Sequence, residues 1–119
     1  MDSYRRVMQG TELEIQTRFE DGCWLVEVRG EIDLSTVGTL EAELHRLSGR
    51  DIVLDLGQVD FIDSTGVALL FRTAGRLTVG AVSSAVERVL RLCGVELDLR
   101  YSSQFPERAE ALEAGGLSE

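Results

Sequence analysis

The sequence predicts an α/β sandwich, in which a mainly parallel or mixed sheet packs with about four helices. Three observations support this fold class. The chain opens with two segments in which apolar and polar residues alternate, as in a β-hairpin. Helix-like and strand-like segments then follow in turn, in the order β, β, α, β, α, β, α, β, α. The helical segments, of about 10 to 15 residues, are long enough to connect parallel strands by right-handed crossovers.

The opening hairpin is predicted from a period of two. Residues 13–19 alternate apolar and polar side chains, which indicates a strand with one solvated face. Glu20-Asp21-Gly22 is a turn signal, and residues 24–29 alternate again. The two segments therefore predict antiparallel strands at one side of the sheet.

The first helix is predicted after a loop at residues 30–33, where Asp33 or Ser35 can cap it. His45 lies off its apolar stripe and is expected on the solvated surface. The apolar residues that recur at helical spacing are Val37, Leu40, Leu44 and Leu47.

The central strand is predicted at residues 52–56, a short apolar run typical of a strand covered on both faces. A loop at residues 59–66 leads into a second helix, which runs to about residue 74 and ends at Gly75.

The remaining elements follow the same alternation. A strand is predicted at residues 77–82, and Ser83 or Ser84 can cap a helix at residues 86–93. A last strand at 97–101 and a helix at 105–112 complete the series. The length of 119 residues suits one domain spanning residues 1–119, with a core at about 13–112 and flexible termini.

Composition excludes several function classes. A net charge of −9, with twelve arginines and no lysine, disfavours binding to nucleic acid or anionic lipid. No apolar run is long enough to span a membrane. Cys23 and Cys93 fall in apolar patterns and are expected to be buried free thiols. The chain has a single histidine and no Cys/His cluster, so we expect neither a metal nor a cofactor.

Chemistry-bearing residues concentrate in one segment, Asp60-Phe61-Ile62-Asp63-Ser64-Thr65-Gly66. Asp63, Ser64 and Thr65 are all capping residues, so the segment has a purely structural interpretation as a well-capped helix start. The functional interpretation is a regulated hydroxyl. A phosphate on Ser64 would add about −1.5 to −2 charges beside Asp60 and Asp63, and would disrupt a protein contact by repulsion.

Three stretches of the chain resemble STAS domains, and specifically stand-alone bacterial anti-sigma factor antagonists. The first is residues 30–36, which resembles the acidic loop of that family. The second is residues 52–56 running into Asp63-Ser64-Thr65-Gly66, and the third is residues 79–95. The resemblance covers about residues 13–112. Members of this family often have a second motif glycine where this chain has Ala68.

The resemblance implies a mechanism. The unphosphorylated antagonist binds an anti-sigma factor that is also a serine kinase, and a sigma factor is thereby released. Phosphorylation of the motif serine, here Ser64, ends binding, and a serine phosphatase resets the switch in the cytoplasm. The residues expected to bind the partner are Asp33, Asp60, Phe61, Ile62, Asp63, Ser64, Thr65 and Gly66.

Two alternatives stay open. The chain could be a STAS scaffold whose serine is never phosphorylated, such as a subunit of a phospholipid-transport ABC complex. An enzyme is disfavoured, because the sequence has no Gly-x-Ser-x-Gly elbow and no lysine for a phosphate-binding loop. Trp24, Phe19 and Phe71 are expected in the core. Phe61 or Ile62, if exposed, would be a partner contact beside Ser64.

Overall fold

A computed structural model describes residues 3–73 and 75–94 of the chain, which form a five-stranded mixed sheet and three helices. The elements along the chain are β1 (Tyr4–Gln9), β2 (Leu13–Glu20), β3 (Cys23–Ile32), α1 (Val37–Arg46), β4 (Ile52–Ile62), α2 (Ser64–Thr73), β5 (Thr78–Val82) and α3 (Ser84–Leu92).

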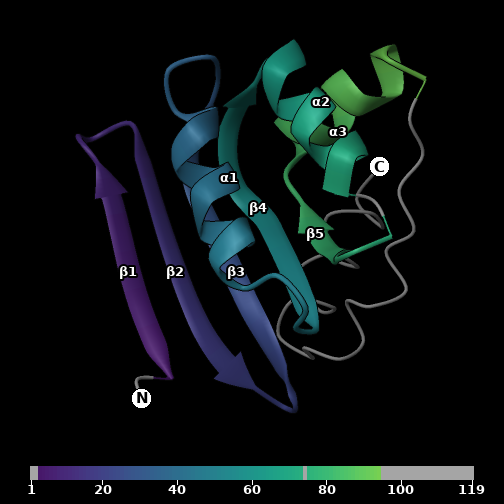
Figure 1. Cartoon of the computed structure of the whole chain (residues 1–119). Coiled ribbons are helices and arrows are strands. Elements are labelled where there is room, and N and C mark those ends of the chain that lie inside the picture. The colour runs from purple at the N-terminus through teal and green to yellow at the C-terminus, as the bar shows by residue number, and fades with distance from the viewer. Residues whose placement is uncertain (1–2, 74, 95–119) are drawn as a thin grey trace.

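The strands lie in the sheet in their chain order, β1-β2-β3-β4-β5 (Figure 1). β1 with β2, and β2 with β3, pair antiparallel, whereas β3, β4 and β5 are parallel. The predicted hairpin is confirmed, with Phe19 opposite Trp24 beside its turn. The mixed α/β fold class is confirmed as well. The predicted strand at 97–101 and helix at 105–112, and the predicted end of the second helix at residue 74, lie outside the described residues.

β1 was not predicted from the sequence. Its residues are mostly exposed, so they show no clear apolar alternation. The strand is held by its pairing with β2 and by side chains that reach α1 and the loop before it. Arg5 Nε donates to Glu43 Oε1 at 3.1 Å, and the Gln9 side chain donates to the carbonyl of Ser35 at 2.7 Å.

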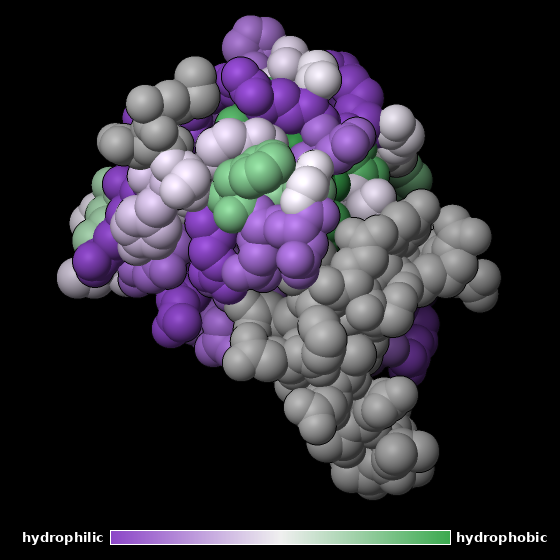
Figure 2. Space-filling view, turned by 90° about the horizontal axis from the view of Figure 1, so that it is seen from below, coloured by the Kyte–Doolittle hydropathy of each residue, from purple (hydrophilic) through white to green (hydrophobic). Residues whose placement is uncertain are grey.

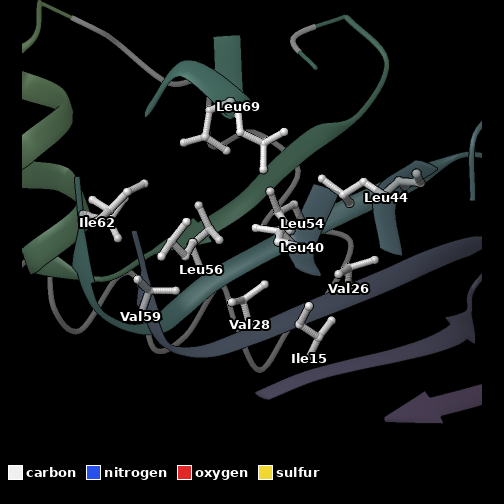
Figure 3. Packing of buried hydrophobic residues seen from close by; sticks show 14 of the residues in the cluster. Ile15, Val26, Val28, Leu40, Leu44, Leu54, Leu56, Val59, Ile62 and Leu69 are labelled. Atoms are coloured by element: carbon white, nitrogen blue, oxygen red, sulfur yellow. The ribbon is translucent and has the colours of Figure 1, made fainter. Parts of the chain in front are cut away.

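The main core lies between one face of the sheet and the three helices (Figure 3). Alternate residues of β2, β3 and β4 point to this face, including Ile15, Val26 and Leu54. They meet the buried stripes of the helices, such as Leu40 of α1 and Leu69 of α2. The predicted apolar stripe of α1 is therefore the side that contacts the sheet. On the other face of the sheet, Cys23, Leu25 and Val53 form a smaller cluster.

β3 and β4 extend further than the sequence predicts. Residues 30–32 and 59–62 were expected in loops, but Glu31 pairs with Phe61 and Ile32 with Ile62 in the parallel ladder. Register shifts interrupt this ladder between Glu27 and Arg29 and again after Gly30. Such irregularities break the alternation of apolar and polar residues. The sequence therefore predicted strands that end before the observed ends of β3 and β4.

Burial differs from the prediction at three side chains. Cys93 is exposed rather than buried, whereas Cys23 is buried as expected. Phe19 is 51% exposed and Phe71 is 61% exposed, so neither is a core residue, whereas Trp24 is buried. Phe19 still contacts Trp24 edge to face, with ring centroids 5.3 Å apart. Hydrophobicity alone predicted burial for these residues, but large apolar side chains are often left on surfaces.

The start of α3 is a local feature that the sequence predicted. Ser83 caps α3, because its Oγ accepts from the backbone N–H of Val86 at 3.1 Å. His45 is exposed, as expected from its place off the apolar stripe. Glu43 is not among the predicted apolar positions of α1, yet it is 3% exposed and accepts a hydrogen bond from Thr17 of β2.

Candidate functional site

The predicted site lies where β3 and β4 end and α1 and α2 begin, at the top of the molecule in Figure 1. The two parallel strands bring their following segments side by side. The N–H of Asp63 donates to the carbonyl of Ile32 at 3.1 Å, which joins the end of β3 to the residue before α2. Residues 33–36, called the acidic loop here, and residues 63–66 are therefore neighbours, although about thirty residues separate them in sequence.

Asp63 caps α2 with one of its two oxygens. Its Oδ1 accepts from the backbone N–H of Thr65 at 2.9 Å and of Gly66 at 3.3 Å, and also from the Thr65 hydroxyl. Its carbonyl accepts from the N–H of Val67 at 3.0 Å. The Thr65 hydroxyl and these backbone donors favour the charged form, so the pKa of Asp63 lies below its ordinary value. The predicted capping role of Asp63 is confirmed.

The other oxygen of Asp63 reaches the acidic loop. Its Oδ2 accepts from the backbone N–H of Leu34 at 3.2 Å. This is a direct side-chain link between the residue that precedes Ser64 and the loop that precedes α1. The Leu34 side chain beside it is 77% exposed.

Asp33 organises the acidic loop from within. Its Oδ1 accepts from the N–H of Ser35 at 3.0 Å, from the Ser35 hydroxyl at 2.7 Å and from the N–H of Thr36 at 3.2 Å. The Ser35 hydroxyl and these other donors hold the pKa of Asp33 below its ordinary value. The buried Thr36 hydroxyl donates to the carbonyl of Glu31 at 2.8 Å. The predicted N-cap of α1 at Asp33 or Ser35 is wrong, because the N-cap residue is Thr36; Asp33 fixes the turn ahead of the helix.

Ser64 is the first residue of α2 and is exposed. Within the described part of the chain, its hydroxyl makes no hydrogen bond. Two of the predicted contact residues flank it on β4 and are also on the surface. Asp60 is exposed, and the Phe61 side chain is 48% exposed.

The remaining predicted residues of this segment, Ile62, Gly66 and Thr65, are buried or partly buried. Ile62 is 2% exposed and belongs to the core, so Phe61 and not Ile62 meets the condition for a partner contact. Gly66 is buried, and a Cβ atom there would lie 2.6 Å from Ile62 Cγ1 and 2.8 Å from Ile32 Cγ2. The φ of Gly66 is not positive, so the glycine is not needed for a left-handed turn. It is required for close packing of α2 on the strands. Thr65 is partly buried and supports the Asp63 cap.

Sequence reasoning missed Leu34. It stands inside the acidic stretch that carried the resemblance, as an apolar residue between Asp33 and Ser35 in a loop. This signal is weak, because single apolar side chains are common on protein surfaces. Leu34, after β3, and Phe61, near the end of β4, are thus two large apolar side chains that are exposed.

The opposite end of the molecule has a different character. Figure 2 views that end, and its described residues present a mostly hydrophilic surface. Two hollows of 690 and 220 Å³ are lined by residues such as Asp51, His45 and Arg76, and neither is lined by a predicted site residue.

Among the residues that the structure describes, no group of His, Cys, Asp and Glu could hold a metal ion. None of the described helices is both long and apolar enough to cross a membrane.

Comparisons with known proteins agree on the family. A family model described as "Mlab, STAS domain" matches residues 15–114. The anti-sigma-B factor antagonist of Staphylococcus aureus (strain NCTC 8325 / PS 47) is 33% identical over 105 residues, which cover 80% of this chain and 96% of that protein. The protein of the same name from strain COL matches equally.

Solved structures show the same fold. An anti-sigma factor antagonist from Mycobacterium paratuberculosis superposes with a TM-score of 0.67 at 23% identity, covering 90% of this chain and 99% of that one. The anti-sigma factor antagonist SpoIIAA in its unphosphorylated form gives a TM-score of 0.51 at 18% identity, covering 89% and 96%. With the family model matching most of the chain and a third of the residues shared with curated relatives, this chain belongs to the STAS domain family.

Proposed function

We propose that this chain is an anti-sigma factor antagonist whose binding is switched by phosphorylation of Ser64. The unphosphorylated form binds an anti-sigma factor that is also a serine kinase, and the sigma factor is released. The observation that carries the proposal is the exposed Ser64 hydroxyl, which no described residue engages, at the start of a helix already capped by Asp63. The names of the curated relatives support the same function.

The geometry suits phosphoryl transfer by a partner kinase. Ser64 Oγ would attack the γ-phosphorus of the ATP bound to the kinase, forming the new O–P bond as ADP leaves. The proton of the hydroxyl would pass to a base of the kinase. A hydroxyl that holds no hydrogen bond within the described fold can turn toward this reaction without loss of a structural contact.

The phosphate would act on the partner contact more than on the fold. The N–H groups of Thr65 and Gly66 are already occupied by Asp63, so they are not free to bind a phosphate on Ser64. The added charge would instead stand beside Asp63 and the exposed Asp60. Repulsion and desolvation of this charge would then weaken docking, with little change in the protein itself.

The docking surface in this proposal combines exposed apolar side chains with carboxylates. Leu34 and Phe61 supply the exposed apolar side chains, and Asp33, Asp60 and Asp63 supply the carboxylates. Buried apolar contacts give most of the binding energy of such interfaces, whereas rim charges steer the encounter. A partner with an apolar patch and basic residues around it fits this surface.

The wider cycle is part of the same proposal. A serine phosphatase removes the phosphate and restores binding, and the exchange takes place in the cytoplasm, where sigma factors meet RNA polymerase. The chain itself has no catalytic activity and binds neither nucleic acid nor a cofactor. Ala68, one turn beyond Ser64 on α2, is partly exposed and adds a methyl group at the edge of the surface.

Intact-mass spectrometry tests the proposal. The protein and Ser64→Ala are each incubated with ATP and the anti-sigma factor kinase of the same organism. One added phosphate on the wild type and none on the variant is the expected result. No phosphate on the wild type would contradict the switch and favour the STAS scaffold, as in a phospholipid-transport complex.

A further inference from the structure

The two oxygens of Asp63 have separate tasks. Oδ1 accepts from the N–H groups of Thr65 and Gly66 and so belongs to the start of α2. Oδ2 accepts from the N–H of Leu34 at 3.2 Å and so belongs to the acidic loop. One carboxylate therefore fixes both the helix that carries Ser64 and the loop that carries the most exposed apolar side chain near it.

The hydrogen bond between Asp63 and Leu34 restrains a loop that side-chain packing does not hold. Leu34 is 77% exposed, so packing does not fix its side chain. Its backbone is held from one side by the turn that Asp33 organises and from the other by Asp63. A loop that is ordered before binding loses less conformational entropy when a partner docks. Without the link to Asp63, the position of Leu34 relative to Ser64 would be set by the loop alone.

We propose that Asp63 is a positioning residue, which holds Leu34 beside Ser64 so that the partner contacts both at once. Leu34 is then a specificity-determining contact for the protein that phosphorylates Ser64. This inference rests on the proposed function, because it names a contact for that same partner. Asp63 itself takes no part in phosphoryl transfer.

The variant Asp63→Asn should keep the cap of α2 and remove the hydrogen bond to Leu34. Asparagine caps helices as well as aspartate does, and its single oxygen can keep the Oδ1 position, where the N–H donors are. The amide NH₂ must then face the N–H of Leu34, donor against donor, and the link is lost. We expect α2 to stay capped and the melting temperature to stay within a few degrees of the wild type.

Asp60→Asn is the charge-matched control for the amide readout, which does not involve the partner. It removes one negative charge from the same surface, at an exposed residue for which no hydrogen bond is found among the described residues. A general loss of charge would act in both variants, whereas loss of the link acts only in Asp63→Asn.

The first readout does not need the partner. In the wild type, the amide proton of Leu34 is expected to be protected from exchange and to shift when Asp63 is protonated in acid. In Asp63→Asn, both the protection and the acid shift should be absent, whereas Asp60→Asn should keep them. An unchanged Leu34 amide in Asp63→Asn would overturn the positioning role.

The second readout is steady-state phosphorylation by the anti-sigma factor kinase. Asp63→Asn and Leu34→Ala should each raise KM about tenfold and leave kcat nearly unchanged, because a contact made equally in the ground and transition states is removed. The double variant should raise KM no further than either single variant, since Asp63 acts through Leu34.

The outcomes distinguish the two hypotheses. Additive effects in the double variant would overturn the positioning role while leaving the switch intact. If the wild type is neither bound nor phosphorylated by the kinase, the proposed function fails, and the Leu34 amide alone decides whether Asp63 holds the loop.

Discussion

Ile32 and Ile62 are paired neighbours in the parallel β3–β4 ladder, and together they occupy the space into which a side chain on Gly66 would project. Both isoleucines are almost fully buried. The helix that carries Ser64 can approach the sheet this closely only because residue 66 has no Cβ. The position of the exposed serine thus depends on buried packing directly beneath it.

Gly66→Ala should destabilise the protein. The added Cβ would meet isoleucine carbons at 2.6 to 2.8 Å, so α2 or the two side chains must move. We expect a loss of about 1–3 kcal/mol in the free energy of unfolding, measured with urea. Gly38→Ala is the control, because Gly38 lies in α1 with open space around it. It should gain about 0.5–1 kcal/mol from helix propensity. Equal effects at the two glycines would contradict this account of Gly66.

Glu43 should matter more than Glu41, although both lie on α1 and each pairs with an arginine. Glu43 is 3% exposed and accepts from the Thr17 hydroxyl at 3.0 Å and from Arg46 Nη2 at 2.6 Å. Burial alone would raise its pKa, but these hydrogen bonds and the charges of Arg46 and Arg5 lower the pKa overall. Glu43→Ala should cost about 1–3 kcal/mol, since it leaves buried Thr17 without its acceptor.

Glu41 provides the matched comparison in the same helix. Its ion pair with Arg72, at 3.3 Å, is about half exposed on both sides. Glu41→Ala should change the free energy of unfolding by less than about 0.5–1 kcal/mol, because exposed pairs contribute little. A cost at Glu41 as large as that at Glu43 would show that burial does not decide the difference.

Stability should fall in acid partly through Asp63. The pKa of this carboxyl is lowered by the hydrogen bonds it accepts in the folded state, so the unfolded chain binds its proton more readily. The contribution is complete above the unfolded pKa of about 3.9 and is lost as the pH falls through the lower folded pKa. Urea unfolding at pH 6 and pH 3 should show a smaller acid loss in Asp63→Asn than in the wild type. An equal loss in both proteins would exclude this contribution.

Substitutions at Ser64 should separate binding from stability. Ser64→Ala should keep affinity for the anti-sigma factor and accept no phosphate, whereas Ser64→Asp should weaken docking by placing a charge beside Asp63. Because the side chain is exposed and makes no hydrogen bond within the described residues, both variants should unfold near the wild-type temperature. Calorimetric binding and thermal melts measure the two effects. Equal affinities of the two variants would speak against a charge-controlled contact.

Much of the fold could be predicted because it depends on local sequence patterns. The hairpin, the strand–helix alternation and the Asp63 and Ser83 caps each depend on residues close together in sequence. β1 could not be predicted, since an exposed edge strand has little apolar alternation. The same limit applies to the outer ends of β3 and β4, whose strand form depends on pairing across the sheet.

The candidate site likewise has features that local sequence predicts and features that it does not. The exposed serine and its capping aspartate could be predicted from one short motif. The link from Asp63 to Leu34 and the fit of Gly66 against Ile32 could not, because each joins residues about thirty positions apart. The exposure of Phe61 beside the burial of Ile62 depends on which face of β4 the helices cover.

The most direct test of the central claim is the affinity of the protein for its anti-sigma factor before and after stoichiometric phosphorylation, measured by calorimetry at one ionic strength. We predict that a single phosphate on Ser64 weakens binding at least about tenfold, which corresponds to about 1.4 kcal/mol. Phosphorylated and unphosphorylated protein that bind equally well would contradict the switch.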